Sequence, residues 1–233
     1  LIDRATIRCS ILRCRADFAE GPWYGDHIAI PEFPPPFSFN PAGAVATLEK
    51  NGWIDTDDNR IRDRDGVAFS FELLLPDEAR DLRRAAAVVQ TDLARAGIEM
   101  RISAVEPSTY FSRLRSRRFD ASIITVANHM MFDPSPLFHS RAVPTGENYC
   151  GFSDPELDPL LDSLRAERDA ETRLKLKRQI SVSLRASAPA VFTFRPHGVA
   201  LIQDRVRAWK IENGRLSALA VWLDDKRKAG GTE

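Results

Sequence analysis

The chain has 233 residues, of which 43% are hydrophobic and 28% are charged, a composition typical of a globular domain with a hydrophobic core. The 33 lysines and arginines balance 33 acidic residues, so the formal net charge is zero. This balance argues against nucleic acid or an anionic membrane as the main partner. No apolar run approaches the roughly 20 residues that a membrane-spanning helix needs. The length fits one large domain or two small ones.

The first residues, from Leu1 to Arg4, show neither an initiator methionine nor the pattern of a signal peptide. We therefore expect a fragment or a processed product. The three cysteines, Cys9, Cys14 and Cys150, have no metal-ligand spacing. Cys9 and Cys14 are five positions apart, which would turn them to different sides of a helix. We expect buried free thiols, with one disulfide as the alternative.

Residues 1–40 are expected to be partly irregular. An amphipathic pattern predicts a helix over 3–15. The proline-rich stretch 18–39 should wrap over the surface rather than form a domain boundary, because proline locks the backbone in an extended form. Asn40 and Pro41 then mark the start of a helix that Gly52 ends.

The middle of the chain alternates between strand and helix patterns. Residues 69–75, 98–102 and 121–126 are rich in β-branched and apolar side chains and predict three strands. A helix over 81–96, ended by Gly97, lies between the first two strands. Such units form right-handed parallel crossovers, so we expect the three strands in one sheet of an α/β domain.

The remainder is predicted to be largely helical. One helix should begin near residue 153 and a second should cover 170–186. Strands are expected at 191–194 and 199–202. The polar residues 226–233 should form a frayed tail.

The acidic segment 55–66 resembles a calcium-binding loop only at first sight. Arg60 stands where such a loop needs glycine, and Gly66 stands where it needs a bidentate glutamate. We therefore predict a solvated turn that holds no calcium.

The end of the third strand is the candidate ligand site. Open α/β sheets bind their ligands where strands end. The polar side chains and the polarizable methionines there are candidates for lining a pocket. The breakers Asp133 and Pro134 close this segment. The alternative is an ordinary connection with two buried methionines. The candidate ligand-binding residues are Thr125, Val126, Ala127, Asn128, His129, Met130, Met131 and Phe132.

The sequence shows no catalytic motif: it has no nucleophile elbow, dinucleotide-binding loop, phosphate-binding loop or zinc-protease helix. His129 and His139 are ten residues apart without cysteine or glutamate partners, so we expect no metal site there. No catalytic residue, metal or cofactor is predicted. This is the profile of a binding protein.

Several motifs in a fixed order resemble one family, the extracellular solute-binding proteins of ABC importers of the peptide/nickel type (family 5). They are L-E-K-N-G-W (48–53), D-x-D-x-N-R-I-R-D-R-D-G (55–66), A-A-A-V-V-Q-T-D-L (85–93), the Phe-Asp pair (119–120), N-Y-C-G-F-S-D-P-E-L-D (148–158) and A-P-A-V-F (188–192). Each motif is weak alone, but their order and spacing together are specific.

The resemblance implies a mixed sheet flanked by helices, as one lobe of a type II (two-lobed) periplasmic-binding-protein-like fold. Residues 1–233 would form the C-terminal lobe, without an N-terminal lobe or export signal. Such proteins are periplasmic, capture a peptide-like or other small solute, and deliver it to an ABC permease in the inner membrane. We expect a monomer that binds no nucleic acid.

The resemblance also places the ligand-lining segment at 125–132. Peptide-binding members commonly carry a tryptophan and then an aspartate there, which pairs with the ligand's α-amino group. This chain has V-A-N-H-M-M at 126–131 instead. We therefore expect Asn128, His129 and Met130 to line the cleft without requiring a primary amine, and Asp133 to be a turn residue.

Two other classes of function stay open. A sensory or regulatory domain can reuse the same binding fold. An α/β enzyme would need a nucleophile–base pair or a metal cluster, which the sequence does not show.

Overall fold

The computed structural model describes residues 1–19, 21–23, 38–126, 133–144 and 146–197, and beyond these 202–203, 206–207, 210–212, 215–217 and 222–223. The chain divides into two compact units, Leu1–Arg195 and Pro196–Glu233. Of the helices in the described ranges, none has the length and apolarity required to cross a bilayer.

The first unit is built on a three-stranded sheet in which β4 (Ser70–Pro76) lies between β5 (Glu99–Val105) and β6 (Ala121–Ser122). Both pairings are parallel. This arrangement confirms the prediction that the three predicted strands share one sheet of an α/β domain. In the described residues this sheet is parallel throughout, and antiparallel pairing occurs in small two-stranded sheets.

The third strand is shorter than predicted, because it ends at Ser122 instead of continuing to residue 126. The Ser122 hydroxyl donates to the Leu74 carbonyl at 3.1 Å, and the Tyr110 hydroxyl donates to the Ile123 carbonyl at 2.7 Å. The Leu74 carbonyl also accepts the Ile123 amide at 3.3 Å, so backbone pairing with β4 reaches residue 123, where a side chain takes up the next carbonyl. Residues 124–126 follow this last contact and are not part of a strand.

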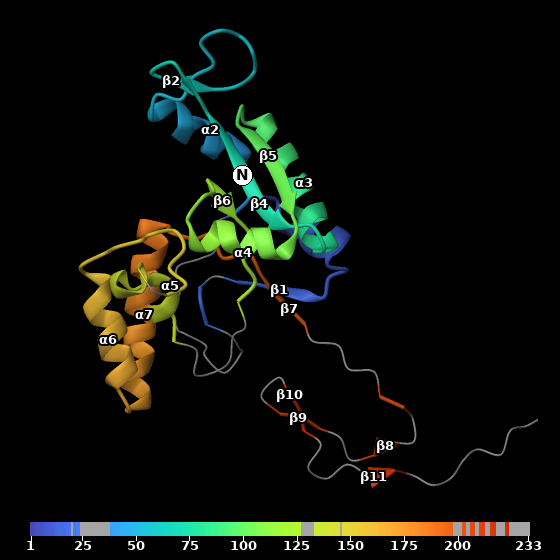
Figure 1. Cartoon of the computed structure of the whole chain (residues 1–233), viewed down its shortest axis with the longest axis vertical. Coiled ribbons are helices and arrows are strands. Elements are labelled where there is room, and N and C mark those ends of the chain that lie inside the picture. Colours follow the sequence, from blue (N-terminus) through green and yellow to red (C-terminus); the bar gives the residue numbers. More distant parts are fainter. Residues whose placement is uncertain are drawn as a thin grey trace, which may run out of the picture. The chain divides into compact units, whose positions relative to one another are not determined.

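Helices cover both faces of the sheet (Figure 1). Leu73 and Leu75 pack with Ala86 of α3 (Arg80–Arg95) on one face. Leu74, between them, points to the other face and packs with two residues of α4 (Pro107–Arg115). This alternation follows from the two-residue period of a strand. An unbroken apolar run at 73–75 is therefore buried on both sides, as expected for a parallel strand.

The N-terminal helix is shorter than the predicted helix over 3–15. It consists of α1 (Arg4–Thr6) and a π-helical turn, η1 (Ile7–Ile11), and is followed by β1 (Ala16–Phe18). Ile7 and Ile11 are buried, and η1 contacts α3. The amphipathic pattern identified the helix but not its end.

The expectation of buried free thiols is wrong. Cys9 and Cys14 form a disulfide with Cα atoms 4.2 Å apart, and Cys150 is a free, exposed cysteine. Both bonded cysteines are also exposed. The prediction failed because it assumed a regular helix through residue 14. The helix ends at Ile11, and the following turn brings Cys14 back beside Cys9.

The helix predicted after Asn40 is confirmed as α2 (Pro41–Lys50). The Gly43 amide donates to the Asn40 side chain at 2.9 Å, which caps the helix, and Gly52 takes a positive φ of 81° just beyond its end. A short hairpin of β2 (Asp63–Arg64) and β3 (Val67–Ala68) follows. Most of the predicted proline-rich wrap, 24–37, lies outside the described residues.

The predicted helical second half is confirmed. The two predicted helices are α6 (Leu157–Ala166), which begins four residues later than expected, and α7 (Ala170–Ser187). Two short helical turns before them, α5 (Ser135–Phe138) and the 3-10 turn η2 (Ser140–Ala142), were not predicted. Their shared core contains Trp23, Phe138, Leu157, Leu161, Leu164, Ile180 and Leu184. The strand expected at 191–194 lies later in the chain, as β7 (Phe194–Pro196), and pairs with β1.

The second unit contains two small antiparallel pairs. β8 (Val206–Arg207) pairs with β11 (Trp222–Leu223), and β9 (Lys210–Glu212) pairs with β10 (Arg215–Ser217). The strand predicted at 199–202 lies outside the described residues except for Ile202, which is not in a strand. The predicted frayed tail, 226–233, also lies outside them.

Candidate ligand-binding edge

Three loops meet at the carboxyl edge of the sheet, because its strands are parallel and end on the same side. The Asp77 amide, just after β4, donates to the Val105 carbonyl at the end of β5 at 2.9 Å. Residues 123–126 leave β6 at the same edge. Binding sites of open α/β sheets form at this edge, so the three loops together are the candidate site.

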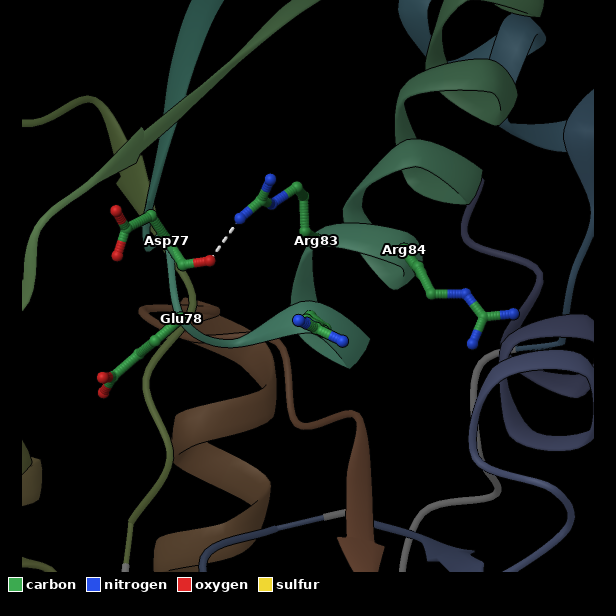
Figure 2. A pocket seen from close by; sticks show the side chains of 5 residues that line it. Asp77, Glu78, Arg83 and Arg84 are labelled. Carbon is green, nitrogen blue, oxygen red and sulfur yellow. Dashed lines mark hydrogen bonds between the residues drawn. The ribbon is translucent and has the colours of Figure 1, made fainter.

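A depression open to solvent lies at this edge, between β4 and the first turn of α3 (Figure 2). Its lining side chains are charged: Asp77, Glu78, Arg80, Arg83 and Arg84. Arg83 donates to the Asp77 backbone carbonyl. Carboxylates and guanidinium groups thus lie close together, so the depression can pair with either charge on a ligand.

The structure describes two of the eight predicted ligand-binding residues. Thr125 and Val126 are exposed where the chain leaves β6, and the Val126 side chain keeps 39% of its surface accessible. Ile124 is 41% exposed. These side chains give the edge an apolar component beside the charged depression. Ala127, Asn128, His129, Met130, Met131 and Phe132 lie outside the described residues.

The Phe-Asp pair at 119–120 fixes the start of β6. The Asp120 carboxylate accepts the Glu72 amide of β4 at 2.9 Å, and Phe119 packs against the cluster around Leu74. Glu72 in turn pairs with Arg113 of α4 at 2.5 Å. The pair therefore positions the strand that leads into the candidate site and does not itself reach the ligand edge.

Tyr110 of α4 contacts the chain just after the end of β6. Burial raises the pKa of its hydroxyl, which donates to the Ile123 carbonyl. This bond links α4 to Ile123, the residue just before the exposed segment 124–126. Tyr110 of α4 thus holds the residue from which the exposed segment continues.

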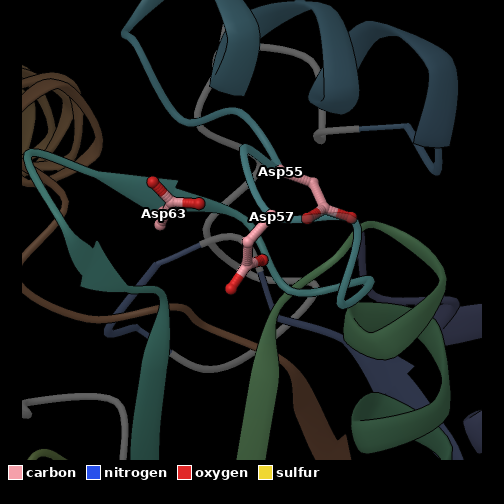
Figure 3. Close-up of side chains that lie close together, drawn as sticks. All are labelled: Asp55, Asp57 and Asp63. Atoms are coloured by element: carbon pink, nitrogen blue, oxygen red, sulfur yellow. The ribbon is translucent and has the colours of Figure 1, made fainter.

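The acidic loop 55–66 lies away from this edge, beside the amino ends of the strands, because the Arg62 amide donates to the Gly97 carbonyl just before β5. Asp55, Asp57 and Asp63 lie close together there (Figure 3), with ligand atoms within 4.8 Å of one another.

Each of these carboxylates already accepts hydrogen bonds inside the loop. Asp55 accepts the Asn59 and Arg60 amides at 3.1 and 2.8 Å. Asp63 accepts the Thr56 amide at 3.0 Å. The carboxylates therefore organise the turn. That the loop binds no calcium stays a prediction, which a calcium titration by calorimetry can check.

His139 is buried in the helical part of the first unit. Its Nδ1 accepts the Arg141 amide at 3.1 Å and lies 3.3 Å from Asp158, and its Nε2 lies 3.5 Å from Asp162. Burial raises the pKa of Asp158, but hydrogen bonds from the Ser140 side chain and amide outweigh it and lower this pKa overall. His139 thus has structural partners. His129, its partner in the rejected metal pair, lies outside the described residues.

Asn148, which begins the N-Y-C-G-F motif, is also structural. Its side-chain amide donates to the His139 and Phe152 carbonyls at 3.1 and 2.8 Å, and its oxygen accepts the Phe152 amide at 3.0 Å. With 1% of its surface exposed, Asn148 closes the loop that leads into α6.

The loop after β4 was missed as a candidate site by sequence reasoning. The rule that pointed to the end of the third strand applies equally to the end of the first. Because the run P-D-E-A-R at 76–80 ends an unbroken apolar strand, it carried the same signal.

A parallel sheet covered by helices, with its loops exposed at the carboxyl edge, is the architecture of a lobe of the periplasmic-binding-protein fold. The chain matches the structure of the oligopeptide-binding protein AppA from Bacillus subtilis, solved with a nonapeptide, with a TM-score of 0.76 and 28% identity. The match covers 84% of this chain and 40% of that chain.

Residues 1–149 match the family described as bacterial extracellular solute-binding proteins, family 5 (middle). The chain belongs to this family, whose members are solute-binding proteins and not enzymes. The resemblance drawn from its motifs is thereby confirmed.

Two curated relatives show how much of a whole protein this chain represents. The oligopeptide-binding protein AppA of Bacillus subtilis (strain 168) is 28% identical over 178 residues, which are 76% of this chain and 33% of AppA. The nickel-binding periplasmic protein of Escherichia coli (strain K12) is 27% identical over 157 residues, which are 66% of this chain and 30% of that protein. The chain thus spans about a third of the length of these relatives.

Proposed function

We propose that residues 1–233 form the C-terminal lobe of a two-lobed solute-binding protein that captures a small solute and delivers it to an ABC permease. The carboxyl edge of the β5-β4-β6 sheet carries this proposal, because it presents exposed loops in a chain of the solute-binding family. In a two-lobed trap, this edge faces the ligand and the second lobe closes over it.

The chemistry of the edge favours a peptide-like solute over a bare metal ion. The depression offers carboxylates and guanidinium groups, and the neighbouring segment offers exposed apolar side chains. Peptides present amides, charged groups and apolar side chains that match these surfaces. Within the described ranges, the one group of three potential metal-ligating side chains lies in the loop 55–66, at the opposite ends of the strands.

The Cys9–Cys14 disulfide supports an extracytoplasmic location. Disulfides persist in oxidising compartments such as the periplasm and are rare in the cytosol. An extracellular solute-binding family fits such a compartment.

We assign ligand contact to the segment Thr125–Phe132, with Asn128, His129 and Met130 as the central residues. This segment continues the exposed chain that leaves β6 at the carboxyl edge. It contains no carboxylate, and an ammonium group buried against it would lack a compensating charge, at a cost of several kcal/mol. An amide and a neutral imidazole can instead hydrogen-bond a neutral or anionic group.

The assignment predicts that a primary amine is not required. In calorimetric titrations of the two-lobed protein, peptides with free and acetylated N-termini should bind with similar affinity. Replacing both Asn128 and His129 with alanine should weaken binding about 30-fold, since two hydrogen bonds contribute about 1 kcal/mol each. Val67→Ala, at an exposed site of β3, is the control and should leave the affinity unchanged.

Two results would contradict this assignment. One is tight binding of free peptides that acetylation abolishes. The other is an unchanged affinity in the double variant. Failure of all peptides to bind, with capture of another solute class, would instead refute the choice of a peptide-like ligand.

A further inference from the structure

We propose that the Cys9–Cys14 disulfide is a redox-sensitive lock that holds the first helix of the chain against β1 and, through β1, joins two distant parts of the first unit. The bond lies outside the ligand edge and belongs to no motif of the family resemblance. The proposal is independent of the ligand, so its test does not depend on the binding experiments.

The backbone between the two cysteines explains why a covalent bond is needed there. The Leu12 amide donates to the Ile7 carbonyl at 3.2 Å, and the Cys14 amide donates back to the Arg8 carbonyl at 2.8 Å. Arg13 and Cys14 have positive φ values of 53° and 56°. Two consecutive residues in this region are unfavourable for L-amino acids, so surrounding structure must hold them. The disulfide supplies that restraint at the second of them.

The turn delivers the chain into a set of contacts around β1. Arg8 donates to the Ala16 carbonyl at 2.7 Å, which ties the helix to the start of the strand. The guanidinium groups of Arg4 and Arg8 lie over the Phe18 ring, 5.1 and 5.5 Å from its centroid. Helix, turn and strand therefore form one module.

This module connects the beginning of the first unit with its end. The Ala19 amide donates to the Thr193 carbonyl at 3.1 Å, and Arg195 donates to the Phe18 carbonyl at 2.7 Å. Arg4 also reaches the Phe192 carbonyl at 3.4 Å. If the turn opens, the start of β1 is no longer held in place. The contacts that join this module to residues 192–195 then weaken together.

The bond is accessible to reagents because both cysteines are exposed. It forms when the two thiols exchange with the disulfide of an oxidising thiol–disulfide protein, which is released with two thiols. A dithiol reductant reverses the step: it supplies two electrons and two protons, both cysteines become thiols, and the reductant becomes a disulfide. An exposed disulfide of this kind makes the module sensitive to the redox state of its compartment.

Limited trypsin digestion of the 233-residue chain tests the lock, because Arg13 and Arg15 flank Cys14 and are exposed. Reduction should speed cleavage at these two sites about tenfold, since proteolysis follows the population of the opened segment. Cleavage at the exposed Arg60, in the distant loop 55–66, should not change. Alkylation with iodoacetamide followed by mass measurement should find one free thiol before reduction and three afterwards.

Matched variants separate the lock from general effects of thiols. The Cys9→Ser/Cys14→Ser variant should be cleaved at Arg13 at the fast rate with or without reductant. Cys150→Ser should behave like the parent chain in both conditions. If the double variant does not fold, reduction of the folded parent chain still decides the question.

Three results would overturn the proposal. The first is an unchanged rate at Arg13 and Arg15 after alkylation has shown that the bond is broken. The second is faster cleavage at Arg60 to the same extent, which would indicate global unfolding instead of local opening. The third is the finding of three free thiols before reduction.

Discussion

Replacing Leu74 with alanine should lower the free energy of unfolding by about 3 kcal/mol, within the range of 2–5 kcal/mol found for such core truncations. Leu74 is fully buried in the central strand and packs against Tyr110 and Leu114 of α4. The substitution removes this contact and leaves a cavity between sheet and helix. Urea denaturation followed by circular dichroism measures the loss.

The matched control for this variant is Val67→Ala in β3, where the side chain is 64% exposed. It should change the free energy of unfolding by no more than about 0.5 kcal/mol. If Leu74→Ala costs as little as this control, α4 is not packed on the sheet as described. That result would also contradict the hydrogen bond from the Tyr110 hydroxyl of α4 to the Ile123 carbonyl.

Replacing Asn148 with alanine should destabilise the helical part of the first unit by about 3 kcal/mol, because buried backbone groups lose their partners at about 1–3 kcal/mol each. The side chain bonds the His139 carbonyl and both backbone groups of Phe152. The Asn148 side chain is buried and its bonds to Phe152 are partly buried, so solvent can replace the lost bonds only in part.

Thermal unfolding measures this effect, with Asn51→Ala as the control. Asn51 is exposed after α2 and donates one side-chain bond, to the Thr47 carbonyl at 2.7 Å. Its loss should cost no more than about 0.5 kcal/mol. Equal and small effects for the two asparagines would show that the loop 148–152 is not held by Asn148. A loss of ligand affinity without loss of stability would give Asn148 a role at the ligand.

The elements with strong periodicity could be predicted from the sequence. The apolar run at 73–75 and the alternation at 98–102 identified two strands, and the helix between them was placed within one residue at each end. Local patterns suffice there because burial on one or both faces determines the residue types directly. The α2 start was also predictable, since its cap is a contact between residues 40 and 43.

The features that depend on distant contacts could not be predicted. Beyond the end of β6, the Tyr110 hydroxyl of α4 takes up the Ile123 carbonyl, a contact that no local pattern reveals. The Cys9–Cys14 bond requires the helix to stop at Ile11, whereas the amphipathic pattern continued to residue 15.

The candidate site was partly predictable, because parallel strands place their ends at one edge. This rule predicted the segment after β6, of which the structure describes Thr125 and Val126; its contact with a ligand stays a prediction. The charged loop after β4 was not predicted, because its short P-D-E-A-R run also fits an ordinary turn into a helix. Conversely, the N-Y-C-G-F motif that contributed to the resemblance proves to hold a loop together.

Hydrogen–deuterium exchange on the two-lobed protein, with and without a saturating pool of short peptides, tests the central claim most directly. Capture at the carboxyl edge predicts slower exchange of the backbone amides at 77–80, 106, 108 and 123–132, because the ligand and the closing lobe exclude water there. Amides at 55–66 and 96–98, beside the amino ends of the strands, should exchange at unchanged rates. Protection confined to 55–66 and 96–98, or bound peptide with no protection at the carboxyl edge, would contradict the account.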